Sequence, residues 1–190
     1  MNKNDIFNKI KIGFNHYSEI VNKEIHYLYE DQGTDKILIL KAKKNNFMHL
    51  CGVDYKLNGR KVSPNHFFSL VKDNRINPDN LILKSDGTTI LKLEAIVNLN
   101  QILTKNIKVL NGKIKFSSFN FDKGLRTRTQ DFALALIDDE KSDNKNLTVP
   151  YSLLKINTAN TLNFLQYSDV KAIYYKEKNK KYTSYYYKEP

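Results

Sequence analysis

Cysteine, long apolar runs and known cofactor motifs are scarce or absent in this sequence. The single cysteine, Cys51, excludes a disulfide framework and a cysteine-rich zinc site, and it fits a reducing compartment. No apolar run reaches membrane-spanning length, and residues 1–21 lack the continuous apolar stretch of a signal peptide. A phosphate-binding glycine loop, an HExxH motif and paired His or Cys spacings for zinc are also missing. We therefore expect a cytoplasmic protein with no membrane contact, no metal and no cofactor.

Positive charge is the most prominent property of the composition. Lysine and arginine number 31 against 20 acidic residues, which gives a formal net charge of +11. Such an excess concentrates polyanions near a protein, and nucleic acid is the expected polyanion in the cytosol. A Lys- and Asn-rich composition also follows from an AT-rich genome, so the charge indicates a partner without locating a groove. A hydrophobic content of 41% is typical of a globular chain with its own core.

The first part of the chain predicts one long helix followed by two strands. Between residues 4 and 28, apolar residues recur at steps of three and four, which is the stripe of an amphipathic helix. The stripe consists of Ile6, Ile10, Phe14, Tyr17, Val21, Ile25 and Leu28. The segments KILILKAK and NNFMHLCGV then predict strands, which can pair as a hairpin across the polar KKNN.

Two helices are predicted next, and strands dominate the remainder. Ser63 is a suitable N-cap and Pro64 suits the first helical position. Apolar spacing predicts another helix over residues 85–106, and the chain ends in a hairpin over 168–190 that is rich in tyrosine and lysine. This order favours a single α+β domain, 1–190, with N-terminal helices packed on a largely antiparallel sheet.

The expected domain has three parts: the N-terminal helix at 1–30, a core at 31–175 and the terminal hairpin at 168–190. We expect the stripe of the first helix to pack on a sheet that includes residues 131–137. In that strand Phe132, Leu134 and Leu136 should be mostly buried, because they alternate with alanine and isoleucine on the other face.

His49 is the first candidate for chemistry, because it is a titratable ring in the apolar run NNFMHLCGVDYK. In a strand it shares a face with Phe47 and Cys51. If that face meets the core, His49 is a structural histidine bonded to a backbone carbonyl. If the opposite face meets the core, His49 faces a cleft and is suited to acid–base catalysis. The sequence leaves both alternatives open.

A second candidate is the segment FDKGLRTRTQDF, which contains Arg126 and Arg128 just before an apolar strand. In an extended chain the two guanidinium groups share one face and can clamp a phosphate bidentately. The alternative is a pair of exposed strand charges in ordinary ion pairs. The acidic run at 138–143 offers ligands for a divalent ion, although such a run is more typical of a solvated loop.

The terminal hairpin is the third candidate. Six of the twelve tyrosines lie between Tyr174 and Tyr187, interleaved with lysines. Aromatic and basic residues together can stack bases and hold a phosphate backbone. Tyrosine also favours ordinary strands, which is the alternative interpretation.

These segments together resemble a known family. FMHLCGV, a Ser-Pro helix with FF, DGTTILKLEAI, FDKGLRTRTQDFALAL and a Val-Pro strand are similar to the fourth phage-associated group of Barnase–EndoU–colicin–RelE-like nucleases. The resemblance covers roughly residues 30–175. It implies an N-terminal helix packed on an antiparallel sheet, and metal-independent cleavage of RNA. It also implies a phage or mobile-element toxin, or a host-directed effector, acting in the bacterial cytoplasm.

The implied mechanism is in-line attack of the RNA 2′-hydroxyl on the adjacent phosphorus, which needs a base, an acid and cations for the phosphorane. The resemblance assigns His49 as acid or base and Arg126 and Arg128 as phosphorane-stabilising groups. The identity of the second acid or base stays open between four residues. One is Asp131, which we include in the catalytic set. The others are His66, Tyr55 and Lys43. The residues expected to contact nucleic acid are Lys43, Lys44, Lys123, Tyr174, Lys178, Lys180 and Lys181.

Two rival functions use the same charge without catalysis. A non-catalytic phage anti-defence protein would bind a host nuclease or its RNA, and its partner would then be a host or immunity protein. A DNA-binding regulator ranks last, because no helix-turn-helix with a basic second helix is present.

Overall fold

The computed structural model describes residues 1–111, 114–116, 119–127, 132–156, 167–176 and 183–189. The helices are α1 (Lys3–Ser18), α2 (Asn46–Cys51), α3 (Pro64–Lys72) and α4 (Thr88–Ile96), with 3-10 helices η1 (Pro78–Asn80) and η2 (Leu99–Leu103). The strands are β1 (Glu24–Asp31), β2 (Thr34–Lys41), β3 (Val53–Leu57), β4 (Arg60–Lys61), β5 (Leu81–Leu83), β6 (Ile107–Leu110), β7 (Ile114–Phe116), β8 (Phe119–Phe121), β9 (Lys123–Thr127), β10 (Phe132–Asp138), β11 (Leu147–Lys155), β12 (Tyr167–Lys176) and β13 (Thr183–Lys188). No helix in these ranges is long and apolar enough to cross a membrane.

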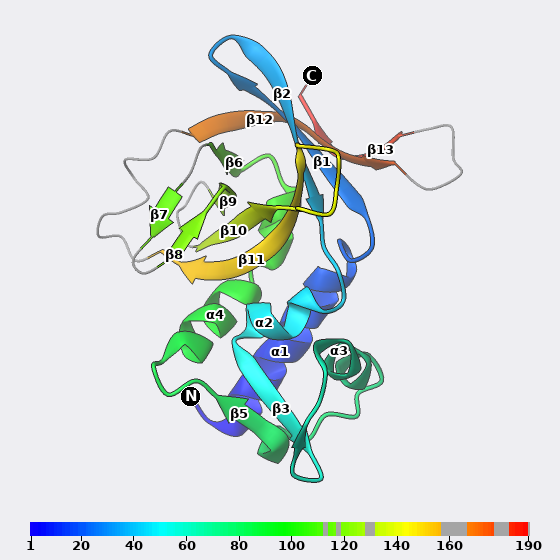
Figure 1. Ribbon diagram of the computed structural model, residues 1–190, viewed down its shortest axis with the longest axis vertical. Coiled ribbons are helices and arrows are strands. Elements are labelled where there is room, and N and C mark those ends of the chain that lie inside the picture. The colour runs from blue at the N-terminus through cyan, green and yellow to red at the C-terminus, as the bar shows by residue number, and fades with distance from the viewer. Residues whose placement is uncertain (112–113, 117–118, 128–131, 157–166, 177–182, 190) are drawn as a thin grey trace.

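The main sheet curls into a barrel. Within the described residues its strand order is β1-β2-β11-β10-β9-β6-β12, and β12 pairs back with β1 to close the ring, while β13 extends the sheet from β12. β2 and β11 run parallel, and the other pairs around this ring are antiparallel. Figure 1 shows the barrel in the upper part of the molecule and the helices below it. The mixture of helices and sheet confirms the α+β class.

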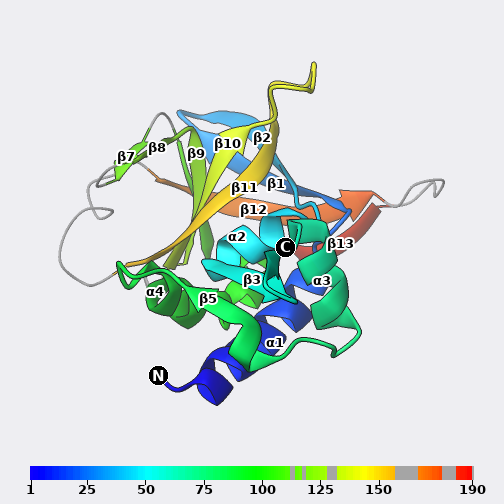
Figure 2. The ribbon, with the colours of Figure 1, turned by 60° about the horizontal axis from the view of Figure 1, so that its bottom comes forward.

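The helices gather at one end of the barrel (Figures 1 and 2). α2 and α4 each contact both β11 and α1, so the first helix reaches the sheet largely through them. The buried residues of the predicted stripe, Ile6, Ile10 and Tyr17, belong to the same hydrophobic core as Phe132 and Leu134 of the strand at 131–137. Gly13 allows α1 to approach α4 closely, because a Cβ there would lie 2.8 Å from the Ile96 side chain. The strand itself is buried as predicted, and Phe132 and Leu134 are 0% exposed, as is Leu136.

Two element boundaries differ from the sequence prediction in the first third of the chain. α1 ends at Ser18, and residues 24–31 form β1 instead of continuing the helix to residue 28. The prediction was wrong because Val21, Ile25 and Leu28 preserve helical spacing by coincidence across a turn and into a strand. The predicted hairpin across KKNN is also wrong, since β2 pairs with β1 and β11, and the following segment is helical.

Local signals placed the start of α3 and the terminal hairpin correctly. α3 begins at Pro64, and the Ser63 side chain caps it by accepting the backbone N–H of His66 at 3.2 Å. The helix predicted over 85–106 is divided into α4 and η2. The terminal hairpin is confirmed as β12 paired with β13.

Candidate active site

His49 lies on α2 and not on a strand. Phe47, Leu50 and Cys51 are buried at positions i, i+3 and i+4 of this helix, and the His49 side chain lies exposed on the other face. The strand prediction was wrong because a short apolar run fits a buried strand and a short buried helix equally well. The structure combines features of the two alternatives that the sequence left open, since His49 is exposed and its ring also hydrogen-bonds the backbone of Tyr151.

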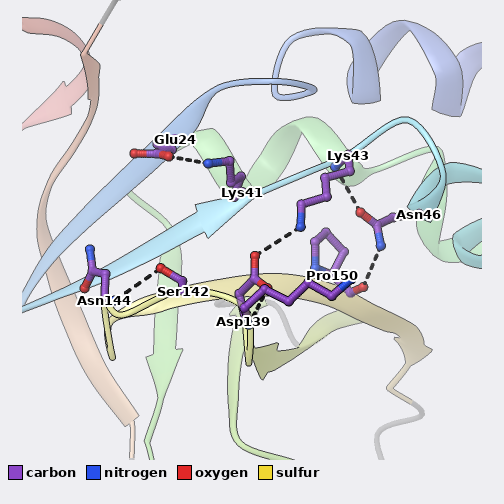
Figure 3. Close-up of polar contacts among 9 residues, drawn as sticks. Glu24, Lys41, Lys43, Asn46, Asp139, Ser142, Asn144 and Pro150 are labelled. Carbon is purple, nitrogen blue, oxygen red and sulfur yellow. Dashed lines mark hydrogen bonds and ion pairs between the residues drawn. The ribbon is translucent and has the colours of Figure 1, made fainter.

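The start of α2 is fixed on the barrel by a small polar network (Figure 3). The Asn46 side chain accepts the backbone N–H of Lys43 at 2.9 Å and donates to the Pro150 carbonyl at 3.4 Å. The Lys43 ammonium pairs with Asp139 at 3.0 Å, and this pairing lowers the pKa of the Asp139 carboxyl. These contacts hold the helix that carries His49 against the end of β10 and against β11.

The end of α2 is fixed on α4. Gly52 adopts a left-handed backbone with φ of +67°, and a Cβ there would lie 2.9 Å from Lys92 Cδ and 3.3 Å from Thr89 Cα. The Thr89 hydroxyl donates to the Gly52 carbonyl at 2.5 Å. Glycine is therefore required twice at this position, for its backbone conformation and for the close approach of α4.

A cavity of about 310 Å³ opens where α2, β3 and the start of α4 meet. Its lining combines an imidazole, two ammonium groups and two carboxylates with small and apolar residues. The lining residues are Met48, His49, Gly52, Val53, Asp54, Pro64, Lys84, Asp86, Thr88 and Lys92. The cavity thus brings His49 together with charged groups that are distant in the sequence.

Lys92 is one of four charged cavity residues that the sequence did not predict, together with Asp54, Lys84 and Asp86. Its side chain is only 7% exposed, and its Nζ donates to the His49 carbonyl at 3.0 Å. Burial lowers the pKa of the Lys92 amine, because the charged form is poorly solvated. A signal for it was present in the sequence, since Lys92 is the one basic residue within the apolar helical segment TTILKLEAI.

The surroundings of His49 favour the neutral form of its imidazole. Partial burial lowers the pKa of the imidazole below its ordinary value of 6.5, and the positive charge of Lys92 lowers it further. The imidazole also donates a hydrogen bond to the backbone of Tyr151, which opposes this shift and orients the ring. A neutral, oriented imidazole can accept a proton at its second nitrogen near pH 7.

The two carboxylates of the cavity are held ionised. Lys61 at 2.9 Å and Lys84 at 3.3 Å share the Asp54 carboxylate, and both lower its pKa. Asp86 accepts the backbone N–H of Thr88 at 2.9 Å, and hydrogen bonds to Thr88 lower its pKa. No group of three or more His, Cys, Asp or Glu suited to a metal ion occurs among the described residues.

Arg126 lies elsewhere, on β9 in the barrel wall. It is 4% exposed, and its guanidinium carbon lies 4.8 Å from the centre of the Tyr167 ring. Burial lowers the pKa of its guanidinium. Arg126 is not among the residues that line the His49 cavity. Arg128 and Asp131 are outside the described residues.

The lysines and the tyrosine predicted to bind nucleic acid have different surroundings. Lys43 and Lys123 form ion pairs, with Asp139 and with Asp138 at 3.0 Å. Tyr174 is stacked on His26 with ring centres 4.9 Å apart. Lys44 is exposed, at the edge of a second hollow that also includes Phe14. The other three predicted residues, Lys178, Lys180 and Lys181, lie outside the described part of the chain.

Tyr55 and His66, two other candidates for the second acid or base, do not line the cavity. Tyr55 is 1% exposed, and its hydroxyl accepts the backbone N–H of Asn77 at 2.8 Å. His66 is exposed on α3 and is not part of the cavity lining. In the acidic run at 138–143, the first two carboxylates are engaged by lysines.

An α+β fold in which an imidazole and ammonium groups share one cavity suits a hydrolytic nuclease. A family model described as phage-Barnase-EndoU-ColicinE5/D-RelE like nuclease4 matches residues 9–189, and the chain belongs to this family. The match confirms the resemblance seen in the sequence and extends it over nearly the whole chain. No curated protein and no solved structure gives a significant match.

Proposed function

We propose that this nuclease cleaves RNA without a metal ion, with His49 as the general base. The observation that carries the proposal is the position of His49: exposed on α2, at a cavity that two lysines also line. The family supplies the nuclease class, and its phage association supports a role as a toxin or host-directed effector in the bacterial cytoplasm.

The proposed reaction begins with removal of the 2′-hydroxyl proton by His49. The 2′-oxygen then attacks the adjacent phosphorus in line, and the 5′-oxygen leaves with a proton from a general acid. The lowered pKa of His49 suits the role of base, because most of the imidazole is neutral near pH 7. Ammonium groups in the cavity are suited to stabilising the charge that develops on the phosphorane oxygens.

The other three residues of the predicted catalytic set also have proposed roles. Asp131 is proposed as the proton donor and Arg128 as a phosphate contact, and neither lies in the described residues. Arg126 is proposed to support the barrel wall, since its guanidinium packs against Tyr167 and does not line the cavity.

The experiment is an RNA cleavage assay in the presence of EDTA with a matched pair of histidine variants. His49→Ala should lower the cleavage rate by about 100-fold or more, as expected for loss of a general base. His66→Ala removes an exposed histidine from outside the cavity and should leave the rate unchanged. Thermal melts should show that both variants stay folded.

Normal cleavage by folded His49→Ala would refute the role of His49. Loss of all cleavage in EDTA, with recovery when a divalent ion is added, would refute the metal-independent mechanism. A wild-type protein that binds RNA and never cleaves it would favour the non-catalytic anti-defence function instead.

A further inference from the structure

Lys92 is a nearly buried lysine that lines the His49 cavity. A buried ammonium group is costly unless an anion is paired with it. Within the described residues, Lys92 forms no ion pair, and its ammonium group donates a hydrogen bond to the neutral carbonyl of His49. An ammonium group has three N–H donors, so two remain for another partner.

The two carboxylates that line the cavity each have other close hydrogen-bond partners. Asp54 is shared by Lys61 and Lys84, and Asp86 accepts the backbone N–H of Thr88. Cys51, which lies close enough to influence Lys92, is buried, and burial raises the pKa of its thiol so that it stays neutral. Among the described residues no carboxylate contacts the Lys92 ammonium directly, although Asp86 acts on it through space and raises its pKa.

Lys92 is also held in position by the fold. Its aliphatic chain passes over Gly52, where a Cβ would lie 2.9 Å from Lys92 Cδ, and its Nζ is fixed on the last turn of α2. The Nζ and the His49 ring belong to the lining of the same cavity. An anion bound by Lys92 would therefore lie in the cavity onto which the His49 ring opens.

We propose that the cavity is a phosphate-binding site in which Lys92 supplies the buried positive charge. The inference rests on the proposed function in one respect, which is that the phosphate is a phosphodiester of the RNA. Lys92 would place that phosphate beside the base and stabilise the negative charge that grows on its oxygens during attack. Its burial would serve this task, because a charge shielded from water acts more strongly on a bound anion.

The test is thermal unfolding of the full chain with inorganic phosphate as the probe, at constant ionic strength set with sodium chloride. Phosphate should raise the melting temperature of the wild-type protein, since a ligand that binds the folded state stabilises it. Lys92→Met should abolish this rise. Without phosphate, Lys92→Met should melt about 2–4 °C higher than the wild type, because an unpaired buried charge has been removed.

Lys105→Met is the matched control, because it makes the same chemical change at an exposed lysine outside the cavity. It should keep the full response to phosphate. If Lys92→Met is poorly folded, Lys92→Gln provides the second test, because it also removes the charge. An equal rise in the wild type and in the Lys92 variants would assign phosphate to surface lysines and overturn the proposal, as would no rise in the wild type.

The two proposals fail in different ways. If His49→Ala cleaves normally while Lys92→Met loses the phosphate response, the phosphate site stands and the role of His49 falls. If His49→Ala loses cleavage while Lys92→Met keeps the phosphate response, the role of His49 stands and the phosphate site falls.

Discussion

Two regions of the molecule each contain a nearly buried cation, and they differ in what covers it. Lys92, 7% exposed, lines a cavity beside His49 and donates to a backbone carbonyl. Arg126, 4% exposed, is covered by the ring of Tyr167 in the barrel wall. The comparison teaches that burial of a charge does not by itself mark a functional site. What distinguishes the two is that Lys92 lines the cavity that His49 also lines, whereas Arg126 does not.

The largest expected effect separates these two regions directly. Lys92→Met should reduce RNA cleavage by about 100-fold, the loss typical of a group that stabilises transition-state charge. Arg126→Met, which keeps a long side chain under Tyr167, should change cleavage by less than about threefold per folded molecule. Single-turnover rates, corrected for the folded fraction, measure both. The reverse order of effects would move the active site to the barrel wall.

The second prediction concerns the junction of α2 with α4. Gly52→Ala should lower the free energy of unfolding by about 1–3 kcal/mol, because it combines a strained backbone with a close contact to Lys92. Gly59 also has a positive φ, but an added Cβ would meet nothing within 4 Å, so Gly59→Ala is the control for backbone strain alone. Urea unfolding of the two variants measures the difference. Equal losses would mean that the approach of α4 to Gly52 is unimportant.

The third prediction concerns the barrel wall. Arg126→Ala should lower the free energy of unfolding by about 1–2 kcal/mol, because the side chain and its packing against Tyr167 are lost. Chemical denaturation gives the value. A stable Arg126→Ala protein with impaired cleavage would contradict the supporting role and revive Arg126 as a substrate contact.

The smallest predicted effect is a shift of one pKa. The charge of Lys92 lowers the pKa of His49, so Lys92→Met should raise that pKa toward 6.5 without reaching it, because partial burial remains. NMR titration of the His49 ring in the two proteins measures the shift. An unchanged His49 titration would mean that the two groups are not electrostatically coupled.

The parts of the fold that the sequence predicted correctly have strong local signals. Ser63 and Pro64 mark the start of α3, and the alternation around Leu134 marks a strand. Closure of the barrel could not be predicted in this way. It depends on the pairing of β1 with β12, whose partners Ile25 and Tyr175 are 150 positions apart in the chain.

The candidate site was predicted only in part. His49 was identified because an imidazole in an apolar run is unusual, but its helix was taken for a strand because six residues contain too few turns to reveal their period. Lys92 was missed because a lysine in an amphipathic helix normally points to solvent. Its burial depends on Gly52, whose missing side chain leaves space for a segment 40 positions away.

The most direct test of the account is the pH dependence of cleavage, measured beside the NMR titration of His49. If His49 is the base, the single-turnover rate should fall about tenfold per pH unit below a pKa that lies under 6.5, because protonation removes the acceptor. The kinetic pKa should equal the pKa of the His49 ring and should rise with it in Lys92→Met. A rate that stays constant while His49 titrates would contradict the central claim that His49 is the base of this nuclease.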